Sequence, residues 1–303
     1  MAKKFMFIIV GFFVAFFAIG CGMVGGYTPL PNTRNSIKLA KTSETKLETV
    51  STSQNKTEEG QSASNPELDL PHTTGAVKPK MVIIIDDFGY DRQGVDLMLS
   101  IDCTLTIAVM PSLMYSEEDA IRAHKQGHEV ILHMPMEAYG NLPSSWYGPL
   151  FIANNDTPEV AYNKINQAIN SIPYCKGINI HMGTAVSQNK TLMRSILKAT
   201  KERNMPFVDS RTIEGSVCKE IGDEIGANVL ERDLFLENHR ANYSITNQKI
   251  TEAINLCLQN GRCIVIGHIG AVGRDITAKC LADNLQRILD AGIEIVPLSA
   301  LYP

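Results

Sequence analysis

Between residue 81 and the C-terminus, short apolar segments typical of β-strands alternate almost without interruption with amphipathic segments typical of α-helices. Repeated β-α units favour a parallel sheet, and this many of them favour a barrel or a large open sheet. We therefore expect an α/β fold that forms a single barrel-like domain. The predicted strands are 81–85, 104–110, 129–133, 177–181, 207–210, 228–230, 263–268 and 294–297, and the predicted helices are 92–100, 116–126, 157–172, 189–203, 214–225, 246–260 and 276–291.

The first of these strands ends in two adjacent carboxylates. The stretch MVIIIDDFGY, residues 81–90, is an aliphatic run that leads into Asp86, Asp87 and a glycine. Such a run predicts a strand buried on both faces, and the carboxyl end of such a strand is where α/β folds place their sites. An Asp at this position is also a common helix N-cap. Because side chains alternate along a strand, the two carboxylates should point to different sides unless the chain turns there.

Other predicted strands also end in polar residues, which a barrel would bring to one mouth. These residues are His133 with Glu137, His181, Asp209 with Arg211, Asp233 and His268, and Glu237 is a further candidate at the mouth. Imidazole and carboxylate groups without thiolates suit a divalent metal such as zinc, with water in an open coordination position. A buried core histidine or a surface ion pair is the ordinary structural explanation for any one of these residues. Three histidines at corresponding strand ends favour a functional site instead.

The N-terminal 78 residues differ in composition from the barrel-like region. Lys3 and Lys4 precede an apolar run over 5–19, and residues 18–21 end at Cys21 in a pattern close to a lipoprotein signal. We interpret residues 1–21 as a signal peptide, a lipoprotein signal or a membrane anchor, each of which exports the protein. Residues 22–78 predict a disordered linker, which leaves 79–303 as the barrel domain. We expect a periplasmic or outer-envelope location, with attachment to the membrane through Cys21 or the apolar segment.

Composition and cysteine spacing exclude two kinds of site. The formal net charge is −4 and 20% of the residues are charged, so no basic excess points to a nucleic-acid partner. The cysteines of the barrel region form no CxxC pair, so a thiolate metal site is not expected. In an exported protein they would either form disulfides or remain as buried thiols. They are Cys103, Cys175, Cys218, Cys257, Cys263 and Cys280.

Six short motifs occur in a characteristic order along the barrel region. They are IDDFGY (85–90), GHEVILHMPME (127–137), NIHMGT (179–184), FVDSRT (207–212), RDLFLEN (232–238) and IGH (266–268). In this order they resemble the divergent polysaccharide deacetylase family of bacterial envelope proteins, a branch of the carbohydrate esterases related to chitin and peptidoglycan deacetylases. The resemblance covers residues 81–303 and implies a distorted (β/α)7 barrel.

The resemblance also implies a metal site. In polysaccharide deacetylases the first acid of the Asp-Asp pair is the catalytic base and the second is a metal ligand, which assigns these roles to Asp86 and Asp87. Two histidines of a His-x-x-x-His motif bind the metal in that family. His133 matches the first of them, whereas Glu137 stands at the second position. Either Glu137 or His181 would then complete the site, with zinc as the expected divalent metal.

The remaining motifs imply an acid and contacts with the substrate. His268 matches the histidine that protonates the leaving group, and Asp209 and Arg211 are candidates for contacting the substrate. The implied function is metal-dependent removal of N- or O-linked acetyl groups from a cell-envelope polysaccharide or peptidoglycan-like glycan. The alternative is a barrel without catalysis that binds an envelope glycan or acts as a scaffold. A glycosidase that uses Asp86 and Glu137 would leave the histidines without a role.

A long segment at 134–153 carries several aromatic residues. Tyr139, Trp146 and Tyr147 lie within it, among prolines and glycines. Aromatic rings combine a large apolar face with a polar edge. They are therefore expected either to stack on sugar rings or to pack onto the rim of the barrel.

Overall fold

The computed structural model describes residues 77–140, 142–237 and 240–302. The predicted signal or anchor at 1–21 and almost all of the predicted linker at 22–78 lie outside the described residues. Among the described helices, none combines the length and the apolar character needed to cross a membrane.

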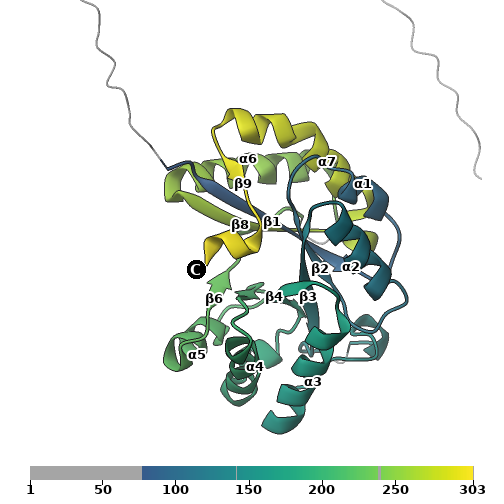
Figure 1. Ribbon diagram of the computed structural model, residues 1–303, viewed down its shortest axis with the longest axis vertical. Helices are drawn as coiled ribbons and strands as arrows, with labels where there is room; N and C mark the ends of the chain where they lie inside the picture. Colours follow the sequence, from purple (N-terminus) through teal and green to yellow (C-terminus); the bar gives the residue numbers. More distant parts are fainter. Residues whose placement is uncertain (1–76, 141, 238–239, 303) are drawn as a thin grey trace, which may run out of the picture. The chain divides into compact units, whose positions relative to one another are not determined.

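All strand pairs of the domain are parallel, and they form one curled sheet of nine strands (Figure 1). Its order is β6-β5-β4-β3-β2-β1-β8-β7, and β9 pairs with the beginning of β1. The fold class expected from the repeated β-α units, a distorted (β/α)7-type barrel, is thereby confirmed. The strands are β1 (Lys80–Phe88), β2 (Thr106–Val109), β3 (Glu129–Met136), β4 (Cys175–Met182), β5 (Phe207–Asp209), β6 (Val229–Glu231), β7 (Leu234–Phe235), β8 (Arg262–His268) and β9 (Glu294–Ile295).

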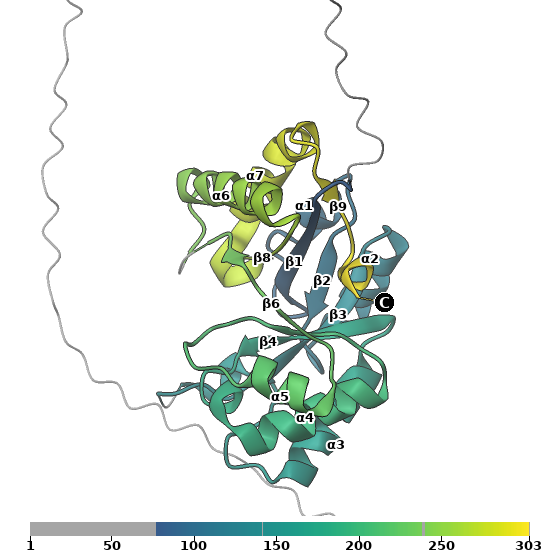
Figure 2. The same cartoon turned by 90° about the vertical axis from the view of Figure 1, so that its left-hand side faces the viewer.

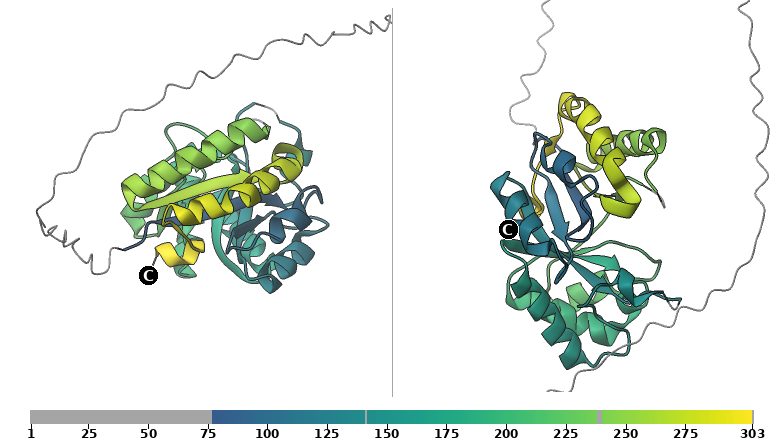
Figure 3. Two further views of the ribbon diagram at one scale, coloured as in Figure 1. Left: turned by 90° about the horizontal axis from the view of Figure 1, so that it is seen from above. Right: turned by 90° about the vertical axis from the view of Figure 1, so that its right-hand side faces the viewer.

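The helices cover the outer face of the curled sheet. Helices α3, α4 and α5 pack in series beside β3 to β6, whereas α6 and α7 lie side by side next to β8 (Figures 2 and 3). The helices are α1 (Val95–Leu99), α2 (Ser116–Lys125), α3 (Pro158–Ser171), α4 (Lys190–Glu202), α5 (Cys218–Ile225), α6 (Tyr243–Asn260) and α7 (Gly270–Asp290), and the 3-10 helices are η1 (Ser144–Trp146), η2 (Val186–Gln188) and η3 (Leu298–Leu301).

Alternation along the strands divides the apolar side chains into two cores. The larger core lies between sheet and helices, and the smaller one is enclosed by the curled sheet. Val82 and Ile84 of β1 and Ile264 and Ile266 of β8 belong to the enclosed core. Leu298 of η3 belongs to it as well and is fully buried. The next residues of the same parity, Asp86 and His268, therefore continue the inward face toward the carboxyl ends of the strands.

The two end strands of the sheet, β6 and β7, do not pair, so the barrel wall has a seam. The short connection from β6 to β7 crosses this seam. Within it, the Asp233 amide donates to the Ile264 carbonyl of β8 at 2.8 Å. The Asp233 carboxylate in turn accepts from the Ile264 amide at 2.7 Å. A side chain thus takes the place of the next strand on this edge of β8.

Helices α1 and α7 begin at other residues than the sequence predicts. Helix α1 starts at Val95 because Gly94 has φ 87, a left-handed conformation that cannot continue a helix. Helix α7 starts at Gly270 rather than at residue 276, with a break at Arg274, where φ is 50 and ψ is −150. The two-residue strand β7 was not predicted, because its pairing depends on the neighbouring edge of β8.

All six cysteines of the described residues are free thiols. Burial raises the pKa of each of them, to about 11 for Cys103, Cys175, Cys257 and Cys280. The same cause raises the pKa of Cys218 and Cys263. We expected either disulfides or buried thiols, and the structure has buried or partly buried thiols, which are unreactive at neutral pH.

Candidate metal centre

The two carboxylates at the end of β1 reach the same site because the backbone turns between them. Asp86 is buried and follows the inward face of β1. Asp87 has φ 72, and the register between β1 and β2 shifts between Ile85 and Phe88. A left-handed residue other than glycine costs on the order of 1 kcal/mol. The turn that the alternation argument required is therefore present, and it is strained.

A partly buried ion pair between Arg92 and Asp119 of α2 supports this turn. The Gly89 amide donates to Asp119 Oδ2 at 3.0 Å, and the Tyr115 amide donates to the Gly89 carbonyl at 3.1 Å. Asp119 has no exposed surface, and its other oxygen pairs with Arg92. The pair fixes the chain immediately after Asp87.

Three side chains from β1, β3 and β4 place one potential metal ligand each within a small triangle. His133 Nε2 lies 3.4 Å and His181 Nδ1 lies 3.2 Å from Asp87 Oδ1. The two nitrogens are 3.1 Å apart. Ligands at about 2.0–2.1 Å from a tetrahedral zinc ion are separated by about 3.4 Å. The triangle therefore has nearly the size of one face of such a coordination shell.

Hydrogen bonds on the far side of each ring leave the facing nitrogens free to coordinate. His133 Nδ1 lies 2.8 Å from Asn179 Oδ1, and His181 Nε2 lies 3.1 Å from the Trp146 carbonyl. Because both oxygens can only accept, these two nitrogens carry the ring protons. Asp87 Oδ1 is buried without a hydrogen-bond partner among the described residues. A metal ion in the triangle would satisfy that oxygen, so the residues present fit a divalent metal.

The ionisation of Asp87 also suits a ligand. Burial would raise the pKa of Asp87, but the facing rings of His133 and His181, when they carry a proton toward it, outweigh burial and hold that pKa well below its usual range. The side chain is therefore a carboxylate at neutral pH, as coordination requires.

Asp86 and His268, the predicted base and acid, lie beside the triangle. Burial raises the pKa of Asp86, which the charges of His133 and His268 oppose only in part. Burial would lower the pKa of His268, but its hydrogen bond to Glu237 and the charges of Asp87, Glu237 and Asp86 raise it to about 9. His268 Nε2 lies 4.0 Å from Asp86 Oδ2. At neutral pH the imidazolium thus holds a proton beside the carboxylate.

Glu237 holds the His268 ring in place. Its Oε2 lies 3.0 Å from His268 Nδ1, and its Oε1 accepts from the His268 amide at 3.2 Å. The Thr277 hydroxyl also donates to Glu237 Oε1. Since Nδ1 is engaged by Glu237, the Nε2 proton of His268 is the one available at the site.

Glu137, one of the four predicted metal ligands, is not part of the triangle. Its Oε2 accepts from the Asn154 amide at 2.7 Å. The sequence predicted a strand that ended at His133, whereas β3 continues to Met136. Four extended residues span about 13 Å, so Glu137 is carried too far along the strand to share an ion with His133. His181 on the neighbouring strand occupies the third position instead.

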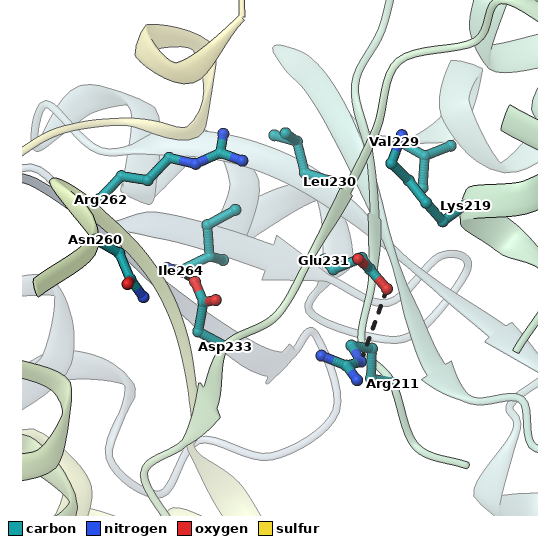
Figure 4. A pocket seen from close by; sticks show the side chains of 9 residues that line it. All are labelled: Arg211, Lys219, Val229, Leu230, Glu231, Asp233, Asn260, Arg262 and Ile264. Carbon is teal, nitrogen blue, oxygen red and sulfur yellow. Dashed lines mark hydrogen bonds and ion pairs between the residues drawn. The ribbon is translucent and has the colours of Figure 1, made fainter. Parts of the chain in front are cut away.

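Asp209 and Arg211, the predicted substrate contacts, lie outside this cluster. Asp209 Oδ1 accepts from the amide of Arg211 at 2.8 Å. Arg211 has φ 48, and its Nε lies 3.8 Å from Glu231 Oε1. It lines a separate cavity of about 300 Å³ between β6 and β8, together with Asp233 and Arg262 (Figure 4). Figure 4 shows Arg211 directed at Glu231.

Sequence reasoning missed the role of Asn179. Its Nδ2 donates to Asp86 Oδ1 at 2.7 Å while its Oδ1 faces His133, so one buried amide joins the candidate base to a candidate ligand. Asn179 is the cross-strand partner of His133 and lies two residues before His181, on the same face of β4. This two-residue spacing from His181 is the sequence signal that could have identified Asn179 as part of the site.

The fold and this cluster define a class: a curled parallel β/α barrel with an Asp-His-His site at the carboxyl ends of its strands. The model of the divergent polysaccharide deacetylase family matches residues 83–302. The chain therefore belongs to the divergent polysaccharide deacetylase family.

Two relatives and one solved structure show what the chain resembles. It is 33% identical over 193 residues to the uncharacterized protein YibQ of Escherichia coli (strain K12), covering 62% of this chain and 58% of YibQ. It is 29% identical over 189 residues to an uncharacterized protein of Haemophilus influenzae, covering 62% of this chain and 66% of that protein. The matched region thus spans less than two thirds of each relative. The crystal structure of protein ATU2773 from Agrobacterium tumefaciens C58 has the same fold, with a TM-score of 0.69, 19% identity and coverage of 76% and 91% of the two chains.

Proposed function

We propose that this protein is a metal-dependent hydrolase that removes acetyl groups from a cell-envelope polysaccharide. The observation that carries the proposal is the triangle of Asp87 Oδ1, His133 Nε2 and His181 Nδ1, with Asp86 and His268 beside it. Membership in the divergent polysaccharide deacetylase family supports the reaction class.

Asp87, His133 and His181 would hold the metal, and their two nitrogens and one oxygen favour zinc. A metal bound there would lower the pKa of a coordinated water and polarise the acetyl carbonyl. Asn179 and the Trp146 carbonyl keep the two imidazole rings in the tautomers that coordination needs.

The chain's own residues move the protons. As the water oxygen bonds to the acetyl carbon, its proton passes to Asp86, whose raised pKa makes it a stronger base than an exposed Asp. As the bond from the acetyl carbon to the sugar nitrogen or oxygen breaks, His268 Nε2 gives its proton to that atom. The products are acetate and the free amine or hydroxyl. Glu237 stabilises the imidazolium until the proton leaves.

We also propose that the domain acts in the cell envelope. The support is the charged and apolar pattern of residues 1–21, with Lys3 and Lys4 before the run at 5–19 and Cys21 after it. A polysaccharide or peptidoglycan-like glycan is the acetylated polymer that an exported enzyme would meet.

The test combines metal content with acetate release from acetylated chitin oligosaccharides. Elemental analysis of the purified protein should show near-stoichiometric metal, which His133→Ala and His181→Ala should lose. Glu137→Ala should keep the metal, because the Glu137 carboxylate binds the Asn154 amide. Asp86→Asn should keep the metal and lose acetate release. A folded protein that takes up no metal under replete conditions would refute the proposal and favour a glycan-binding barrel without catalysis.

A further inference from the structure

The seam of the barrel wall, between β6 and β8, has no helix of its own. Strands β1 to β5 are each followed by an α-helix before the next strand, whereas β6 leads directly into β7. Strand β7 pairs only with the carboxyl-terminal half of β8, so the amino-terminal half of β8 has no strand beside it on this edge. The cavity of about 300 Å³ lies in this gap, and Figure 4 shows Arg262 on its β8 side and Val229, Leu230 and Glu231 on its β6 side.

The free edge of β6 turns unpaired backbone groups toward this cavity. The Arg232 amide donates to the Asp209 carbonyl of β5 at 3.0 Å. In a parallel ladder the N–H and C=O groups of one residue face one neighbouring strand, and those of the next residue face the opposite side. The backbone groups of Val229 and Glu231 therefore face away from β5 and into the seam, where no described strand pairs with them.

The facing edge of β8 is only partly filled. Both backbone groups of Ile264 face the seam and are bound by Asp233, one through its amide and one through its carboxylate. Arg262 lies two residues earlier, so its amide and carbonyl face the same way, and no residue of the described chain bonds to them. Unpaired edges on the two sides of a gap form a template for one more strand.

The charged side chains around the cavity leave a positive charge without a partner. Those that line it are Arg211, Lys219, Glu231, Asp233 and Arg262. Both carboxylates are engaged, that of Asp233 by a β8 amide and that of Glu231 by Arg211 at 3.8 Å. Lys219 pairs with a carboxylate of its own helix, whereas Arg262 is exposed and forms no ion pair within the described part of the chain. The cavity therefore complements an acidic ligand.

We infer that the seam binds an extended acidic segment of a partner protein, which adds as a strand between β6 and β8. Its backbone pairs with Val229 and Glu231 on one side and with Arg262 on the other. In this mode of recognition the main-chain hydrogen bonds supply affinity and the side chains supply selectivity. Its carboxylates lie among Arg211, Lys219 and Arg262. The seam is on the wall of the barrel, so the inference does not depend on the proposed hydrolase.

Peptides of opposite charge test the inference on the full chain. Calorimetry with a peptide blocked at both ends, in which Glu alternates with Val, is compared with the same peptide carrying Lys in place of Glu. Free glutamate is the third ligand, because it has the charge without the extended backbone. We expect saturable binding of the Glu peptide alone. No binding of the Glu peptide, equal binding of the Lys peptide, or displacement of the Glu peptide by free glutamate would overturn the inference.

Two substitutions at Glu231 separate the backbone contact from the charge. Glu231→Pro removes the seam-facing N–H of β6 without removing a bond to β5, and proline is tolerated at such an edge position. Loss of this hydrogen bond should weaken binding of the Glu peptide roughly tenfold, although a negative charge is also lost. Glu231→Gln is the matched control, because it loses the same charge and keeps the N–H, and it should bind the Glu peptide at least as tightly as the wild type. Equal affinities of the two variants would refute the strand pairing.

The opposite wall is tested by charge reversal. Arg262→Glu should weaken binding of the Glu peptide about tenfold. Lys198→Glu, which reverses a 64% exposed cation on α4, should leave the affinity unchanged. Equal effects of these two changes would mean that the peptide senses only the overall charge, and the seam would be excluded.

Hydrogen exchange on the unaltered protein gives an answer that does not depend on any variant folding. Saturating Glu peptide should slow exchange of the amides of Val229, Glu231 and Arg262 at least about tenfold, because these groups become hydrogen-bonded. Unchanged exchange at all three amides would overturn the inference. Sedimentation of the chain without peptide distinguishes a partner from a second copy. A dimer that Arg262→Glu dissociates would assign the seam to a second copy of this chain and overturn the inference of a separate partner.

Discussion

Replacing Asn179 by leucine tests the coupling between the candidate base and the candidate metal ligand. Leucine has a similar shape but can neither donate to Asp86 Oδ1 nor accept from His133 Nδ1, which lie 2.7 Å and 2.8 Å from the amide. Each lost bond leaves a buried partner unsatisfied at about 1–3 kcal/mol, so the free energy of unfolding should fall by roughly 2–6 kcal/mol. Loss of the support for His133 should weaken metal binding about 10- to 100-fold.

Asn179→Asp separates the two halves of that effect. A carboxylate at this position still accepts from His133 Nδ1, so metal affinity should recover most of what the leucine variant loses. It also faces Asp86 at the distance of the present 2.7 Å bond, and two carboxylates so close must share a proton. Asp86 then ceases to act as a free base, and activity should stay low.

The assay is a zinc titration against a competing chelator, with urea unfolding of the metal-free protein and acetate release measured on the same samples. The expected order of metal affinity is wild type, then Asn179→Asp, then Asn179→Leu. If the leucine variant binds zinc as tightly as the wild type, or if both variants lose affinity equally, the assignment of Asn179 as the residue that fixes the His133 tautomer is wrong.

Three other changes test further contacts. Glu237→Gln removes the charge that raises the pKa of His268 to about 9, so the loss of kcat/KM on the alkaline side should begin at lower pH than in the wild type; an unchanged profile would exclude His268 as the acid. Asp119→Ala removes the buried acceptor of the Gly89 amide and should lower the free energy of unfolding by about 2 kcal/mol in urea titrations. In Gly273→Ala the new Cβ would stand 1.6 Å from the His268 carbonyl oxygen, so acetate release should fall while metal content stays unchanged.

Much of the site was predictable because the interior of this barrel obeys simple alternation. Val82, Ile84 and Asp86 lie at every second position of β1, and Ile264, Ile266 and His268 repeat the pattern on β8. A strand that is apolar inside and polar at its carboxyl end can be recognised from the sequence, and the repeated β-α units place these ends together. The parallel sheet and the places of Asp86 and His268 at its carboxyl edge follow from that regularity, whereas their roles as base and acid are implied by the family resemblance.

The rest of the site depends on deviations from this strand alternation. No local sequence signal indicates that Asp87 adopts φ 72 or that β3 continues past His133 to Met136. These two features nevertheless determine that the Asp87 carboxylate reaches the triangle and the Glu137 carboxylate does not. The choice of His181 over Glu137 depends on the pairing of β3 with β4, which is a contact between distant segments. The orienting roles of Asn179 and Glu237 likewise require neighbours 93 and 31 residues away.

The cost of the buried cluster leads to a prediction about stability. Asp86, His133 and Glu237 are almost completely buried, Asp87 is strained, and its Oδ1 is unsatisfied among the described residues. Buried charged groups without full compensation destabilise a fold, and an ion that binds only the native state offsets this by mass action, by about 4 kcal/mol at a concentration 1,000 times its Kd. Zinc should therefore raise the Tm of the wild-type protein, and a chelator should lower it again. His133→Ala should abolish this zinc dependence, whereas Glu137→Ala should preserve it. A Tm that is insensitive to zinc in the wild type, or equally sensitive in His133→Ala, would show that the triangle is not where the metal binds.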